Sequence, residues 1–317
     1  MSILTTPATA GATAAETVRS ALQRRERDVT GWAMLLTLLL TSFLTLAILT
    51  ALLVQVVGEA GPMLAERQLG FVSSPIGSDP DTMGIWSGLY GTIAIGLIVL
   101  VVAIPMGVAA AIYLEEYARA TNPLTRFTLI NIRNLAGVPA VIYGVLGFII
   151  FTDWLEPVTH GKTALSAGLT MAVLVLPIVV ITSMEAIRAV PAGIRDAGFG
   201  LGASRWEVTR DHVLPYAAPG ILTGTMLSIA RALGEAAPLI IVGAITGLLP
   251  KTSLTGEFTA VPILIYQWSG RPRPTGSEYG FTESAAAAGL VLLVIVLFFN
   301  AGAIYLRNRF ERVRIGS

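Results

Sequence analysis

Arg231 and Glu235 are the residues of this chain whose types and spacing are best suited to chemistry, because they carry charge inside an otherwise apolar stretch. Near the middle of a membrane, an arginine costs about 2.5–3.5 kcal/mol on insertion scales. The pair belongs to a set at the 4, 3, 4 spacing of one helical face: Gly224, Ser228, Arg231 and Glu235. We therefore expect this face to meet protein or water. A guanidinium there stays charged and offers several donors to an oxyanion.

Two roles are open for this pair. In the first, Arg231 and Ser228 line the path of an anion, and Glu235 orients the arginine and keeps the anion from binding too tightly to be released. In the second, the ion pair holds its helix against a neighbouring subunit and touches no substrate. We favour the first role, because ionisable residues inside a membrane are usually functional.

The elements that must position this pair are membrane-spanning helices. A helix needs about 20 apolar residues to cross a hydrocarbon core of about 30 Å. Six regions meet or approach that length: 32–57, 85–114, 135–151, 165–184, 221–249 and 285–306. Only the fifth contains Asp, Glu, Lys or Arg. The expected fold class is therefore all-α, a polytopic membrane protein with six transmembrane helices.

Most of the 21 Lys and Arg residues fall on one side of these six regions. Because short loops rich in Lys and Arg remain in the cytoplasm, both termini are predicted to be cytoplasmic. The chain then divides into four parts: a tail at 1–31, a first span with its outer loop at 32–84, a transmembrane core at 85–310 that contains a loop at 185–220, and a tail at 311–317. The outer loops, 58–84 and 250–284, could bind an external partner.

Composition excludes several classes of function. The chain is 54% hydrophobic and only 13% charged, against about 25% charge in ordinary soluble domains. Its net charge of +1 gives no broad electropositive surface for nucleic acid. The absence of cysteine excludes disulfides and thiolate sites. His160 and His212, the only histidines, fall on opposite predicted sides of the membrane, so no metal site is expected.

The polar loop between the fourth and fifth predicted spans is the second distinctive segment. Pro191 is a good first-turn residue for a helix running towards Leu201. Gly202 supplies a break, and Ser204 could cap a second short helix that carries Trp206. An amphipathic helix with an exposed tryptophan suits a groove on a partner. The alternative is a solvated loop that binds nothing.

This loop is similar to the signature loop of the permease subunits of bacterial ABC importers. The spacing is matched by Asp196-Ala197-Gly198, then Gly202, then Val213-Leu214-Pro215, although Asp196, Gly198 and His212 replace the usual Glu, Ala and Ile. In that family the loop is a coupling helix that inserts into a cleft on a separate ATPase subunit. The resemblance implies a type I ABC importer permease fold. It also implies ATPase coupling by Asp196, Ala197, Gly202, Ala203, Ser204, Arg205, Trp206, Leu214 and Pro215.

Further stretches resemble the PstA-type permeases of bacterial phosphate importers: Pro105 and residues 90–92, 113–117, 137–139, 229–239, 261–268 and 307–310. This resemblance implies a phosphate path past Arg231 in the bacterial cytoplasmic membrane. The implied partners are a sister permease, two ATPase subunits and an extracytoplasmic phosphate-binding protein. ATP and Mg²⁺ would bind to the ATPase, so this chain would be no enzyme and would hold no cofactor. Ile181 stands where members often carry arginine, so a second cationic group is absent or comes from a partner.

Three other functions compete with phosphate import. The nearest is a permease of the same architecture for sulfate, molybdate or an organic solute. An ATP-independent anion channel would use the same arginine. An intramembrane enzyme could use Glu235 and Arg231 as an acid and an electrostatic partner, but no accompanying Gly-x-Ser-x-Gly or His-Glu-x-x-His motif is present.

Overall fold

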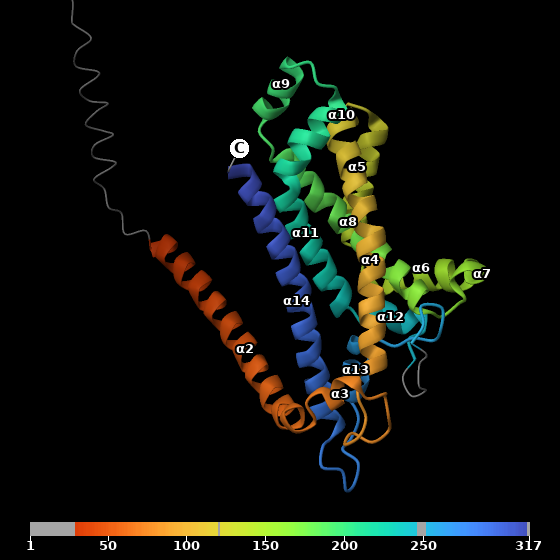
Figure 1. Cartoon of the computed structure of the whole chain (residues 1–317). Helices are drawn as coiled ribbons and strands as arrows, with labels where there is room; N and C mark the ends of the chain where they lie inside the picture. The colour runs from red at the N-terminus through yellow and green to blue at the C-terminus, as the bar shows by residue number, and fades with distance from the viewer. Residues whose placement is uncertain (1–28, 120, 246–251, 316–317) are drawn as a thin grey trace, which may run out of the picture. The chain divides into compact units, whose positions relative to one another are not determined.

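The computed structural model describes residues 29–119, 121–245 and 252–315, and helices form nearly all of their regular structure (Figure 1). The chain divides into two compact units, residues 1–54 and 55–317. Most of the predicted N-terminal tail, residues 1–28, lies outside the described residues, as do residues 316 and 317 of the predicted C-terminal tail.

Helix α2 (Val29–Arg67) begins in the first unit and contains the first predicted span. Its residues 29–54 expose almost every large apolar side chain. The hydroxyl of Thr37 donates to the carbonyl of Ala33 at 2.8 Å, and that of Thr41 to the carbonyl of Thr37 at 2.9 Å. These hydroxyls are therefore satisfied within the helix, as a lipid environment requires. The helix has 39 residues and is longer than the predicted 32–57.

The second unit contains the other long helices and several short ones. The long helices are α4 (Trp86–Ile112), α8 (Ala164–Arg188), α11 (Leu214–Gly234) and α14 (Phe281–Ile315). The short elements are α3 (Leu69–Ser73), η1 (Tyr113–Tyr117), α5 (Pro123–Ala136), α6 (Ala140–Gly147), η2 (Phe148–Trp154), α7 (Glu156–Thr159), α9 (Ala192–Gly200), α10 (Arg205–Val208), η3 (Thr209–Val213), α12 (Ala237–Val242) and α13 (Val261–Trp268). Five described helices are long and apolar enough to cross a membrane, and a bent pair would make a sixth span.

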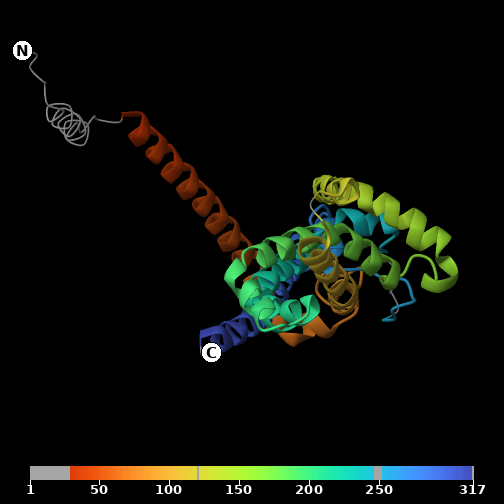
Figure 2. The ribbon, with the colours of Figure 1, turned by 90° about the horizontal axis from the view of Figure 1, so that it is seen from above.

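That bent pair corrects the third predicted span, residues 135–151. The chain turns by 103° between α5 and the continuous helix formed by α6 and η2. Pro139 explains the break, because it lacks an N–H and disfavours helical geometry at the residue before it. As a result, α6 and α7 project sideways from α4 and α8 in Figures 1 and 2.

The fifth predicted span, residues 221–249, is also corrected. The helix starts earlier, running without interruption from Arg205 through η3 and α11, and it ends at Gly234. Glu235 is extended, with φ −86° and ψ 118°. Pro238 accounts for this stop, because its ring would clash with the carbonyl four residues earlier, that of Gly234. Residues 246–249 of the predicted span lie outside the described residues.

Helix α8 lies at the centre of the second unit, between α4 and α11. It is the most buried of the long helices. One core cluster joins Ile95 and Val99 of α4, Met171 and Val175 of α8, and Ala232 of α11. This packing sets the position of α11, the helix that carries Arg231.

Two glycines let α11 approach α8 closely, as the Gly220-x-x-x-Gly224 spacing predicts. A Cβ atom at Gly220 would lie 2.7 Å from the Cβ of Ala186. At Gly224 it would lie 2.1 Å from Oγ1 of Thr182 and 2.5 Å from its Cβ. No side chain can enter the second position without moving one helix.

Gly224→Ala is expected to lower the free energy of unfolding by about 1–3 kcal/mol, because it overpacks the contact between α8 and α11. Gly302→Ala on α14 is the matched control, since a Cβ there meets nothing within 4 Å. Thermal or denaturant unfolding of the purified chain in detergent measures both changes. Equal stability of the two variants would contradict the close approach.

Candidate functional site

Arg231 lies in the last turn of α11, and Glu235 follows at the C-cap of that helix. Their closest charged atoms, Nε and Oε1, are 3.6 Å apart. The side chains remain 40% and 31% exposed in this single chain. Negative partial charge at a helix C-terminus favours a cation in the last turn. Two sources of negative potential therefore hold the guanidinium, and part of it stays accessible.

The predicted four-residue stripe is divided in the structure. Ser228 and Gly224 are buried, and the hydroxyl of Ser228 donates to the carbonyl of Gly224 at 2.9 Å. Arg231 lies on the exposed part of the helix. Glu235 is outside the helix, so the ion pair spans the helix end instead of one continuous face. A role for Ser228 in substrate passage stays a prediction.

The loop after α8 folds as its local signals predict. Pro191 is the N-cap of α9, and Gly202 has φ +80°, a conformation that favours glycine. Ser204 caps α10 through a capping box: its hydroxyl accepts from the Glu207 N–H at 3.4 Å, and the Glu207 carboxylate accepts from the Ser204 N–H at 2.7 Å. The second helix is not short as expected, because α10 continues without a break into the following span, Arg205–Gly234.

The structure brings the predicted coupling residues together at one end of the second unit, with α3 and α13 at the other end (Figure 1). Most of them are exposed: Asp196, Ala197, Gly202, Ser204, Arg205, Trp206 and Pro215. Ala203 and Leu214 are half-buried. Their role in coupling to an ATPase is not tested by this placement and stays a prediction.

Two exposed apolar residues that precede Trp206 in the same loop were missed by the sequence reasoning. Phe199 is 47% exposed and Leu201 is 87% exposed, and Trp206 is 52% exposed. We call Phe199, Leu201 and Trp206 the coupling face. The signal was present in the sequence as large apolar residues placed between the glycines of a polar loop.

A bridge links the two loops that are predicted to lie outside the membrane, at the opposite end of the unit. The Asp81 carboxylate accepts from the backbone N–H of Tyr279 at 2.8 Å and of Glu278 at 2.9 Å. These two hydrogen bonds lower the pKa of Asp81. The Tyr279 hydroxyl donates to Glu66, which raises the pKa of Tyr279 to about 12. The carboxylates of this bridge hold the loops together at neutral pH.

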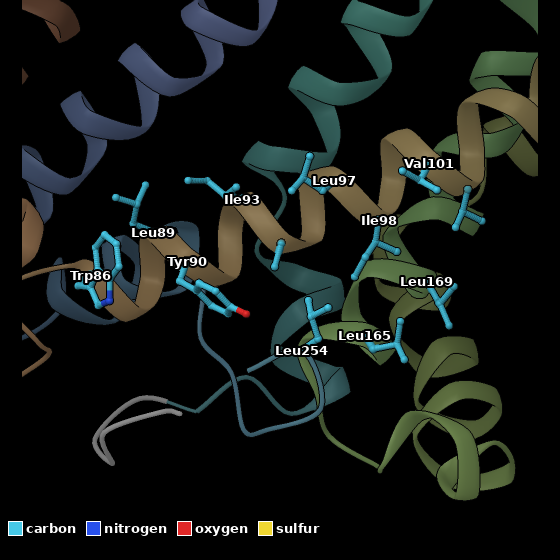
Figure 3. A pocket seen from close by; sticks show the side chains of 12 residues that line it. Trp86, Leu89, Tyr90, Ile93, Leu97, Ile98, Val101, Leu165, Leu169 and Leu254 are labelled. Carbon is cyan, nitrogen blue, oxygen red and sulfur yellow. The ribbon is translucent and has the colours of Figure 1, made fainter. Parts of the chain in front are cut away.

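A groove of about 510 Å³ runs along α4 and α8, and it is unsuited to an anion (Figure 3). It is lined by Trp86, Leu89, Tyr90, Ile93, Ala94, Leu97, Ile98, Val101, Val102, Leu165, Leu169 and Leu254. None of these side chains is charged, and Arg231 does not line the groove. Within the described ranges, no three Asp, Glu or His side chains are grouped closely enough to hold a metal ion.

Comparisons with known proteins identify the family and the fold of the chain. The family described as "Binding-protein-dependent transport system inner membrane component" matches residues 103–312. The chain is 32% identical over 273 residues to "Phosphate transport system permease protein PstA 1" of Mycobacterium tuberculosis, covering 86% of each chain. It is 31% identical to "Phosphate transport system permease protein PstA" of Mycobacterium leprae, covering 82% of this chain and 83% of the relative.

Among solved structures, a chain of a bacterial alginate ABC transporter, crystallised with its alginate pentasaccharide-bound periplasmic protein, matches with a TM-score of 0.58. It is 18% identical and covers 90% of this chain and 98% of its own length. At that identity the match shows the fold, which is the all-α fold of type I ABC importer permeases. The chain therefore belongs to the family of binding-protein-dependent transport system inner membrane components.

Proposed function

We propose that this chain is the transmembrane permease subunit of an ATP-driven importer of inorganic phosphate. The observation that carries the proposal is Arg231, a cation at the end of an apolar helix, held beside Glu235 with part of its side chain accessible. The two mycobacterial relatives named as phosphate permeases support phosphate as the substrate.

Arg231 is proposed to replace part of the hydration that phosphate loses on its way through the membrane. Its guanidinium can donate two parallel hydrogen bonds to one oxyanion, and it stays charged at every physiological pH. Glu235 competes with phosphate for the same donors. The competition keeps the affinity low enough for release, whereas an unopposed arginine would hold the anion tightly.

The energy for transport is proposed to come from separate subunits. The coupling face would bind a groove on an ATPase, and the ATPase would hold ATP and Mg²⁺ and carry out hydrolysis. Two such subunits, a sister permease and an extracytoplasmic phosphate-binding protein would complete the complex. The binding protein would dock on the outer loops joined by Asp81 and Tyr279.

This assignment places the coupling face in the cytoplasm of a bacterium and the outer loops on the opposite side of its cytoplasmic membrane. Both termini would then be cytoplasmic. The excess of arginine in the loops on the coupling side supports that orientation.

A permease for sulfate or molybdate is the nearest second candidate, because its substrate would also need a guanidinium. Competition by these anions against labelled phosphate uptake in reconstituted vesicles separates the candidates. An anion channel would instead conduct without ATP.

Arg231→Gln is expected to lower the rate of labelled phosphate uptake at least about tenfold, since a hydrogen bond to a charged group is worth about 1.5–3 kcal/mol. Assembly and ATP binding should remain. The matched control is Arg126→Gln, which removes an exposed arginine from α5. Undiminished uptake by Arg231→Gln would refute the substrate-path role.

Trp206→Ala and Leu201→Ala are each expected to weaken recovery of the ATPase with the permease and to reduce ATPase stimulation by the loaded binding protein. Buried interface anchors typically cost more than about 2 kcal/mol on truncation. Leu297→Ala on α14 is the control, because this side chain is 56% exposed but lies on a predicted span. Normal stimulation in both coupling-face variants would count against the assignment.

A further inference from the structure

The end of α4 is joined to the segment that carries the coupling face. Glu115 of η1 forms an ion pair with Arg188, the last residue of α8. Glu116 of η1 forms one with Arg195 of α9, whose Nε and Nη2 atoms lie 3.1 and 2.8 Å from the same carboxylate oxygen. Successive helical residues point in different directions, which lets neighbouring carboxylates reach different elements.

The next residue of η1 extends this set of contacts to a third element. Tyr117 lies against Arg205, the first residue of α10, with 5.4 Å between the guanidinium carbon and the ring centroid. Three consecutive residues therefore contact arginines at the end of α8, in α9 and at the start of α10.

The pair of Glu116 and Arg195 differs from the other two contacts in its burial. The Glu116 side chain is 8% exposed and that of Arg195 is 22% exposed. Arg195 also donates to the carbonyls of Val190 at 2.8 Å and Ile187 at 2.9 Å. The guanidinium of Arg195 in α9 therefore links this helix to η1 and to the end of α8. A buried carboxylate that lost this partner would be left uncompensated.

Helix α4 continues into η1 at one end and contacts α13 near the other. There, the hydroxyl of Thr92 accepts from the backbone N–H of Val261 at 2.9 Å, at the start of α13. Between the two ends, Gly96 meets Leu233 of α11, where an added Cβ would lie 2.9 Å from Cδ2 of the leucine. Leu233 is in the same turn as Arg231. A single helix therefore touches the coupling segment, the helix that carries the arginine, and α13.

We infer that the ion pair between Glu116 and Arg195 is the joint that passes movement of the coupling face to α4, and through α4 to Arg231 and α13. Both residues are positioning residues and contact no substrate in this role. The inference rests on the proposed function, because it assigns the connection between ATP-driven closure and the phosphate path. A rigid, buried contact can transmit displacement, whereas an exposed ion pair yields to it.

The test uses the complete complex in proteoliposomes: this chain, its sister permease, the ATPase subunits and the phosphate-binding protein. Glu116→Gln is compared with Glu115→Gln, which removes the neighbouring carboxylate whose partner, Arg188, is 59% exposed. Labelled phosphate uptake and ATP hydrolysis are measured together, and their ratio gives phosphate moved per ATP. Loss of folded complex lowers both rates equally and leaves this ratio unchanged, so a merely structural role would not alter it.

Glu116→Gln is expected to lower the ratio at least about fivefold, the lower end of typical coupling effects. Glu115→Gln should change it by less than about twofold, because Glu115 is 14% exposed but its partner Arg188 is 59% exposed, and an ion pair with a solvated partner contributes less than a buried one. Should Glu116→Gln fail to assemble, Glu116→Asp keeps the charge, shortens its reach and is measured in the same way. The proposed role of the Glu116–Arg195 ion pair would be overturned by an unchanged ratio in the assembled Glu116 variant, or by equal losses in both variants. Absence of ATP-dependent phosphate uptake by the unmodified complex would instead overturn the proposed function itself.

Discussion

The structure depends on the cost of placing a guanidinium within an apolar helix. A membrane-buried arginine costs about 2.5–3.5 kcal/mol on insertion scales, and Arg231 is 40% exposed in the single chain. That surface cannot face lipid tails, so it must meet water or another subunit. The break at Glu235, which Pro238 imposes, places a carboxylate and a helix C-terminus beside the charge. Earlier along the same helical face, α11 packs tightly on α8 through Gly220 and Gly224.

Those contacts make α11 part of a unit with two distinct ends. The coupling face lies at the end where the polypeptide leaves α8, and the bridge of Asp81 and Tyr279 joins the predicted outer loops at the other. Helix α4 contacts α13 through Thr92, and η1, which continues α4, contacts α9 through Glu116. Gly96, Gly220 and Gly224 allow α4, α8 and α11 to pack closely against one another. A displacement at the coupling face would therefore reach Arg231 without any flexible connection.

Features set by neighbouring residues could be predicted from the sequence, and features set by distant ones could not. Apolar length located the spans, and Pro191, Gly202 and Ser204 located the starts of α9 and α10 and the break between them. Pro139 and Pro238 break the third and fifth predicted spans. The prediction ran each span through its proline because the surrounding residues are apolar. The contact of Glu116 with Arg195 joins residues 79 positions apart, and no periodicity reveals such a pairing. The exposure of Leu201 depends likewise on how α9 and α10 pack.

The central claim is that the charge at position 231 serves the passing anion, and charge restoration tests it most directly. The chain has no cysteine, so Arg231→Cys would carry its only thiol. In complexes reconstituted with cysteine-free partners, phosphate uptake is measured after attachment of a cationic aminoethyl or an anionic sulfonatoethyl group through a methanethiosulfonate. The cationic group is expected to restore part of the uptake, and the anionic group is not. Equal uptake with either group attached would contradict the claim.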